Sequence, residues 1–278
     1  MKNSYLTLAS VILPLFCSPN LLGAETNDTT ITDLTNLVAK INAKLVAGKT
    51  NEADYADNFK EFDALLAKHK DAKPEELTQI VVADYQLYFQ VFDDPEPALE
   101  LLKRVKHDYP TVQPNGNMER VIKGLESLVA QRKIWHSLAV GTKFPNFTAM
   151  TLASRPLSLS EYNSNVVLID FWITESRPCQ AELPDLFKTY SKHHSQGFDN
   201  IGVSLDDNPI KALGIVTVAR MPWPQICDGQ GWKSKLVARY GVYHLPSTFL
   251  LDGQGTIIGK DLQGDALEQA VAKALAKK

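Results

Sequence analysis

Cysteine is scarce in this sequence. The 278 residues contain three cysteines, at positions 17, 179 and 227, too few for a small fold held together by disulfides. No glycine-rich phosphate loop is present and no group of side chains has metal-ligand spacing, so we expect no cofactor and no metal. A formal net charge of only −3 gives no electrostatic reason to bind nucleic acid or an anionic membrane.

The N-terminus has the pattern of an export signal. Lys2 precedes an apolar stretch that Pro14 interrupts and that is too short to span a membrane. Ala24 suits the last position before a cleavage site. We interpret residues 1–24 as a signal peptide, with a disordered or buried N-terminal helix as the alternative. Bulky Phe16 disfavours a lipoprotein signal at Cys17. Cleavage would remove Cys17 and yield an exported protein without a membrane span.

Residues 25–137 are predicted to form a helical domain. Apolar residues recur at helical spacing in five stretches, over residues 31–45, 55–66, 77–92, 98–105 and 118–129. Asp94 and Pro95 are typical of a helix start, with Asp as N-cap and Pro at the first position. The short connections suggest a small bundle or a tetratricopeptide-like stack. No cluster of reactive side chains occurs here. If the protein is a binding module, this half is a candidate for holding a protein partner.

Residues 138–278 alternate between strand and helix patterns. We expect strands at residues 147–152, 156–159, 166–172, 200–205, 224–227, 247–251 and 256–258, and helices at 178–192, 209–220, 233–240 and 265–277. Strands that alternate with helices predict an α/β domain whose sheet is covered on both faces.

Several ordered segments of this half resemble a known family. They are Val140–Phe147, Val167–Trp172, Arg177–Pro184, Ile201–Asp206 and Tyr240–Asp252. Together they resemble the bacterial thioredoxin-fold proteins of the exported TlpA/ResA type, also called redoxins and grouped with AhpC/TSA proteins. The resemblance implies a thioredoxin-like fold with a central mixed sheet, a periplasmic or extracellular location, and thiol–disulfide oxidoreductase activity on protein thiols or disulfides.

The active-site motif departs from that family at one position. Thioredoxin-type chemistry uses two cysteines three residues apart, and the first position here is Ser176. A serine hydroxyl is barely ionised at neutral pH and forms no disulfide, so the usual cycle between positions 176 and 179 is impossible. Ser176 is nevertheless a good helix N-cap. The remaining candidate nucleophile is Cys179, and the resemblance implies that Asp170 is its buried base.

Other positions match the family's substrate groove. The resemblance implies that Leu245 and Pro246 form a cis-proline loop where an extended peptide segment docks. Trp172, Arg177 and Pro178 flank the cysteine and are candidate substrate-binding residues.

Two charges and one further thiol complete the predicted site. Glu175 is expected to raise the pKa of Cys179, and Arg177 to lower it. Cys227 ends a short strand. The carboxyl ends of parallel strands meet at one edge of a sheet, where the active-site turn is also expected, so Cys227 is a possible resolving thiol.

Two alternatives remain open at this point. Cys179 could be a buried, inert thiol in a non-catalytic protein-binding module. Ser176 could instead assist a peroxidatic Cys179, as a hydroxyl residue does at this spacing in peroxiredoxins. Trp172 stands where the peroxiredoxin motif has a proline, which favours the TlpA-type interpretation.

Overall fold

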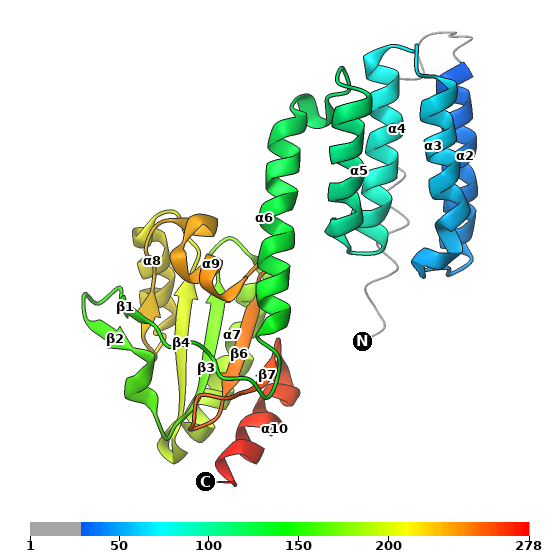
Figure 1. The fold of residues 1–278 in the computed structure, drawn as a ribbon. Helices are drawn as coiled ribbons and strands as arrows, with labels where there is room; N and C mark the ends of the chain where they lie inside the picture. Colours follow the sequence, from blue (N-terminus) through cyan, green and yellow to red (C-terminus); the bar gives the residue numbers. More distant parts are fainter. Residues whose placement is uncertain (1–28, 278) are drawn as a thin grey trace. The chain divides into compact units, whose positions relative to one another are not determined.

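The computed structural model describes residues 29–277 (Figure 1), which form two compact units that divide between Val129 and Ala130. The proposed signal peptide, residues 1–24, lies outside the described residues. Within residues 29–277, no helix combines the length and the apolar character needed to cross a membrane.

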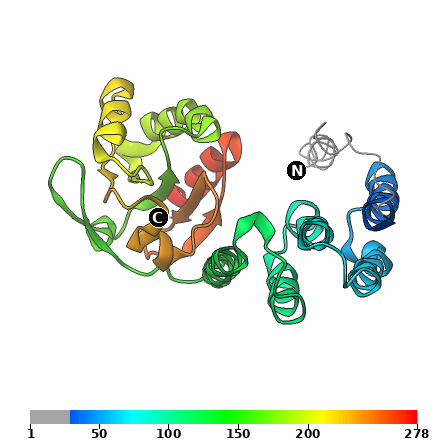
Figure 2. The same cartoon turned by 90° about the horizontal axis from the view of Figure 1, so that it is seen from above.

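The first unit consists of helices. They are α2 (Thr29–Val46), α3 (Ala56–Lys68), α4 (Pro74–Gln86), α5 (Pro95–Asp108) and the first part of α6 (Met118–Ser137). All five predicted helices are therefore confirmed. The Asp94 side chain accepts a hydrogen bond from the Glu96 N–H, as the N-cap prediction requires. In Figure 2 the helices follow one another as neighbours.

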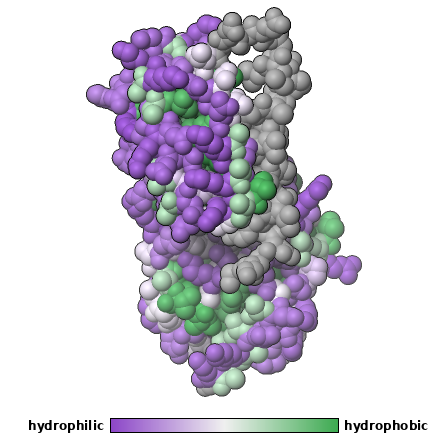
Figure 3. Space-filling model, turned by 90° about the vertical axis from the view of Figure 1, so that its right-hand side faces the viewer, coloured by the Kyte–Doolittle hydropathy of each residue, from purple (hydrophilic) through white to green (hydrophobic). Residues whose placement is uncertain are grey.

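The core of this unit is made by one face of each helix. Tyr55, Phe62, Ile80 and Leu102 are fully buried in it. The visible side of this unit in Figure 3 is largely hydrophilic, which agrees with amphipathic helices.

The third predicted helix is not uniform. After α4 the chain forms a π-helical turn over Leu87–Val91. The rings of Tyr88 and Phe59 stack with centroids 4.3 Å apart, and the Phe92 ring meets Tyr55 edge-on at 5.3 Å. We attribute the turn to this packing, because an extra residue in the turn changes which side chains face the neighbouring helix.

The second unit is built around a five-stranded sheet. Its strands are β3 (Val166–Trp172), β4 (Phe198–Ser204), β5 (Gln225–Ile226), β6 (Ser247–Leu251) and β7 (Ile257–Lys260). The order is β5-β4-β3-β6-β7, with β3, β4 and β5 parallel and β6 and β7 antiparallel. A separate hairpin joins β1 (Thr148–Met150) to β2 (Pro156–Ser158).

Helices cover both faces of this sheet. Alternate residues of β3 point to opposite faces. Val166 and Leu168 belong to a core shared with α7 (Arg177–His193) and α10 (Gly264–Leu275). Val167 and Ile169 belong to a core shared with Tyr240 of α9 (Lys235–Tyr240) and with the end of α6. This is the predicted thioredoxin-like α/β fold, with a mixed sheet.

The sheet also fixes the place where functional groups collect. All seven residues of β3 are buried, and β3 runs parallel to β4. The carboxyl ends of parallel strands meet at one edge of a sheet. The loop from β3 to α7 therefore lies beside the loop from β4 to α8 (Pro209–Ala219).

Candidate functional site

Ser176 forms the start of α7. Its backbone is extended, and its side-chain oxygen accepts a hydrogen bond from the Cys179 N–H at 3.3 Å. Pro178 stands in the first turn, where a missing N–H costs nothing. The predicted N-cap is confirmed, and it places Cys179 in the first turn of the helix.

Cys179 is buried beneath this turn, with 5% of its surface exposed. Burial raises the pKa of its thiol, and the charges of Asp170 and Glu182 act in the same direction. Hydrogen bonds from the Ser176 hydroxyl and the Ile173 backbone oppose that rise. The thiol is therefore protonated at neutral pH, and reaction requires a base to take its proton.

Two carboxyl groups lie close enough to influence this thiol. Burial, and to a lesser extent the charge of Glu182, raises the pKa of Asp170 to about 7. Burial followed by the charge of Asp261 raises the pKa of Glu182 to about 7. Both groups change protonation near neutral pH, which is the range that suits a general base.

Glu182 was not among the predicted site residues. It lies three residues after Cys179 on α7, a spacing that puts both side chains on one helix face. Its Oε1 is buried without a hydrogen-bond partner among the described residues. The helical spacing was the signal in the sequence that could have identified it.

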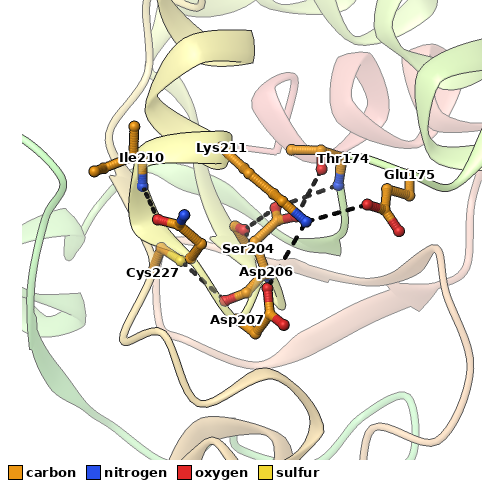
Figure 4. Close-up of polar contacts among 9 residues, drawn as sticks. Thr174, Glu175, Ser204, Asp206, Asp207, Ile210, Lys211 and Cys227 are labelled. Atoms are coloured by element: carbon orange, nitrogen blue, oxygen red, sulfur yellow. Dashed lines mark hydrogen bonds and ion pairs between the residues drawn. The ribbon is translucent and has the colours of Figure 1, made fainter.

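A second buried carboxylate, Asp206, anchors the turn before Ser176. It accepts hydrogen bonds from the Thr174 N–H at 3.3 Å, from the Thr174 hydroxyl at 2.6 Å and from the Ser204 hydroxyl at 2.6 Å (Figure 4). These bonds fasten the β3–α7 loop to the end of β4. The sequence analysis missed this anchor, although Thr174 and Asp206 each follow the end of a parallel strand.

Glu175 pairs with a lysine and is not among the charges that shift the pKa of the Cys179 thiol. It is exposed, and Lys211 of α8 lies 3.2 Å from its carboxylate (Figure 4). The groups that raise the pKa of Cys179 by charge are Asp170 and Glu182, and the groups that lower it do so by hydrogen bonds. The expected opposition of Glu175 and Arg177 is therefore not what determines this pKa.

Cys227 is a free, half-buried thiol. Its Sγ–H donates to the Asp206 carbonyl oxygen at 3.4 Å (Figure 4). It therefore contacts the loop whose Asp206 anchors the turn before Ser176. Cys179 is also a free thiol.

The predicted substrate-binding residues differ in exposure. Arg177 and Pro178 lie on the surface of the turn. Trp172 is buried, and its indole N–H donates to the Gln225 side chain at 2.9 Å. The structure therefore uses Trp172 to connect β3 with β5.

The Leu245–Pro246 peptide bond is cis, and both residues are half-buried. His244 lies beside them, with Nδ1 3.0 Å from the Pro246 carbonyl oxygen and Nε2 3.7 Å from Asp261. A titratable imidazole is thus part of this loop. Among residues 29–277, no group of three or more His, Cys, Asp or Glu side chains could hold a metal ion.

Comparison with known proteins gives a consistent family signal for this half. Residues 140–260 match the model of the AhpC/TSA family. The thiol-disulfide oxidoreductase ResA of Bacillus thuringiensis subsp. konkukian is 26% identical over 140 residues, covering 50% of this chain and 79% of ResA. The Bacillus subtilis ResA is 25% identical over 122 residues, covering 44% and 66% of the two chains.

Solved structures match the same half of the chain. The thioredoxin domain of a thiol-disulfide oxidoreductase from Bacteroides vulgatus is 30% identical, with a TM-score of 0.46, covering 49% of this chain and 96% of that domain. A thiol:disulfide interchange protein from Bacteroides sp. is 31% identical, also with a TM-score of 0.46, covering 50% and 92%.

Proposed function

Because the C-terminal half of this chain belongs to the AhpC/TSA family of thioredoxin-fold proteins, we propose that it exchanges thiols and disulfides through a single cysteine, Cys179. The observation that carries the proposal is the arrangement at the start of α7. Ser176 caps the helix and bonds the thiol, while two carboxyl groups with pKa values of about 7 lie behind it. With serine at position 176 the site lacks one thiol, but the groups that act on the Cys179 thiol are all present.

The proposed step is attack on a substrate disulfide. Asp170, in its ionised form, takes the proton from the Cys179 thiol, directly or through water. The Cys179 sulfur then forms a bond with one substrate sulfur while the substrate S–S bond breaks. The departing substrate thiolate takes up a proton. Ser176 and the N-terminal N–H groups of α7 stabilise the negative sulfur while it exists.

The product of that step is a mixed disulfide. Since Ser176 cannot resolve it, a second thiol must attack the Cys179 sulfur or the substrate sulfur. Cys227 is the candidate within this chain, and a small-molecule or protein thiol is the candidate outside it. Resolution by an outside thiol would be slow, so the two-cysteine (dithiol) site of the family is impaired in this chain.

The substrate and location follow from the same interpretation. We propose that an extended protein segment docks along the Leu245–Pro246 loop, with Arg177 and Pro178 at its edge. We also propose that residues 1–24 direct export, which places the mature protein in the periplasm or outside the cell. The helical half, residues 25–137, would bind another protein.

Disulfide reduction assays on insulin test this proposal. The wild-type protein should be slow, and Ser176→Cys should increase the rate at least tenfold by restoring the resolving pair. Cys179→Ala should abolish activity in both backgrounds. A Ser176→Cys variant that folds and remains as slow as the wild type would contradict the proposal.

The second candidate is a non-catalytic binding module, and the burial of Cys179 favours it. A thiol that is 5% exposed and has a raised pKa reacts slowly with any partner. In that case Cys179→Ala would leave every activity of the protein unchanged. The third candidate, a single-cysteine peroxidase, would consume peroxide in a Cys179-dependent way without reducing insulin.

A further inference from the structure

Helix α8 presents an apolar face to solvent. Ile210 is 75% exposed, Leu213 44% and Val218 83%, and Gly214 and Thr217 on the same face are also exposed. Three of the nine large exposed hydrophobic residues in the described part of the chain therefore lie on this one helix. Isolated exposed apolar residues are ordinary, but a continuous apolar helix face marks an interaction surface.

Gly214 stands at the centre of this face. Glycine inside a helix costs about 1 kcal/mol relative to alanine. Among residues 29–277, nothing lies within 4 Å of the position that a Gly214 Cβ would occupy, so no contact in this part of the chain requires a glycine there. A missing side chain at the middle of an exposed helix face allows another helix backbone to approach closely.

The sequence of α8 is self-complementary about this glycine. Ile210 and Val218 are each four residues from it, so a two-fold axis through Gly214 would pair Ile210 of one copy with Val218 of the other. The charges at the ends agree with this antiparallel arrangement. Asp207, before the helix, lies 4.0 Å from Lys211 of the same chain, but 84% of its side chain remains exposed to a second partner. Arg220, after it, is exposed and makes no ion pair within residues 29–277.

Antiparallel pairing would bring each Asp207 close to the Arg220 of the other copy, whereas parallel pairing would bring the two Arg220 side chains together. We propose that α8 forms the two-fold interface of a homodimer, in which helices of two copies pack antiparallel and cross at Gly214. Figures 1 and 2 show α8 at the edge of its unit, with its outer side clear of the other elements of that unit. The partner is a second copy of this chain. One two-fold rotation about Gly214 places Ile210 against Val218, Gly214 against Gly214 and Asp207 against Arg220.

The expected dimer is weak. An eleven-residue helix is only about 16 Å long, and an interface built on it falls at the low end of specific interfaces, below about 1,200 Å². Association should therefore depend on concentration, and it should be measured on the full chain by sedimentation equilibrium up to about 1 mM.

The first test changes one exposed valine. Val218→Lys should weaken dimerisation at least tenfold in Kd, because it places an ammonium group against Ile210 of the other copy. Val46→Lys is the matched control, since Val46 is 81% exposed at the end of α2. A wild-type protein that is monomeric at every concentration would overturn the proposal, as would a dimer that survives Val218→Lys.

A charge pair across the axis tests the geometry itself. Ile210→Glu alone should weaken the dimer, and Ile210→Glu combined with Val218→Lys should restore it to within about threefold of the wild type. The two positions are about 12 Å apart along one helix, so they cannot compensate each other within a chain. A double variant no better than the single variants would overturn the antiparallel arrangement.

Cross-linking provides a readout that does not depend on affinity. In a background of Cys17→Ser, Cys179→Ser and Cys227→Ser, Gly214→Cys should form a covalent dimer under mild oxidation. This requires a Cα separation below about 7 Å at the axis. Val46→Cys in the same background is the control. Equal cross-linking by the two variants would overturn the proposal.

Discussion

At the scale of single residues, Asp170 links the stability of the C-terminal unit to pH. Its pKa rises from 3.8 to about 7 on folding, so the folded state binds more protons than the unfolded state between those values. The contribution of Asp170 to stability is therefore fully present below about pH 4 and is lost as pH rises through 7. A buried carboxylate destabilises the fold above that range.

We predict that Asp170→Asn raises the free energy of unfolding at pH 8 by about 2–4 kcal/mol, and changes it by less than about 1 kcal/mol at pH 4. Urea unfolding at the two pH values, followed by tryptophan fluorescence, measures both. Asp228→Asn, on an exposed residue, is the control and should show no such difference. Equal effects of Asp170→Asn at the two pH values would contradict the linkage.

Ser176 has a capping role that can be separated from its effect on the thiol. Ser176→Ala should lower the free energy of unfolding by about 1 kcal/mol through loss of the cap, and should slow alkylation of Cys179 by removing a hydrogen bond to its sulfur. Ser176→Asp retains a capping oxygen and adds a negative charge, so it should preserve stability and slow alkylation further. If the free energy of unfolding and the alkylation rate of Cys179 change together in both variants, the two roles are not separable.

Sequence alone predicted Ser176, Cys179 and Asp170 as site residues because the family's motif places them at fixed spacings. It did not identify Asp206, because the role of that carboxylate depends on the side-by-side placement of two loops that are 32 residues apart in sequence. It also credited Glu175 with an effect on the thiol. In the folded chain the Glu175 carboxylate pairs with Lys211 instead. The sequence does not show that these two residues are neighbours.

At the scale of elements, the β3–α7 loop depends on Asp206. Asp206→Ala would leave the Thr174 and Ser204 donors without their acceptor in a buried site, so we expect a loss of about 2–4 kcal/mol in unfolding free energy. Thr174→Val removes only one of these donors, so it should lower the free energy of unfolding by about 1 kcal/mol. Hydrogen exchange at residues 173–177 should accelerate in Asp206→Ala. Unchanged exchange there would show that the loop is held by other contacts.

Element positions were otherwise well predicted, for a physical reason. Helical and strand periodicity in a sequence reflects the burial of apolar side chains. In both units the helices and strands bury their apolar side chains in a core, so the periodic pattern was informative. The π-helical turn at Leu87–Val91, in which Tyr88 stacks on Phe59, was missed. Such a contact between distant residues leaves no periodic signal in the sequence.

At the scale of the whole molecule, each unit has its own core, and tryptophan reports on only one of them. The four tryptophans are Trp135, Trp172, Trp223 and Trp232, which all follow the division at residue 129. Phe62→Ala, in the helical core, should remove about 3–5 kcal/mol from the helical unit. The loss should be seen in far-ultraviolet circular dichroism, with the tryptophan transition unchanged. Phe171→Ala should shift the tryptophan transition. A single shared shift for both variants would contradict independent cores.

The central claim is that Cys179 remains a reactive thiol without a cysteine at position 176. Intact mass of the native protein, alkylated after exposure to oxidised glutathione, tests it most directly. On protein lacking residues 1–24, and so Cys17, we predict one glutathione adduct or a Cys179–Cys227 disulfide in the wild type. We predict one adduct in Cys227→Ala and neither product in Cys179→Ala. Native protein that stays unmodified, with Cys179 and Cys227 alkylating only after denaturation, would contradict the claim and leave a binding module in place of an enzyme.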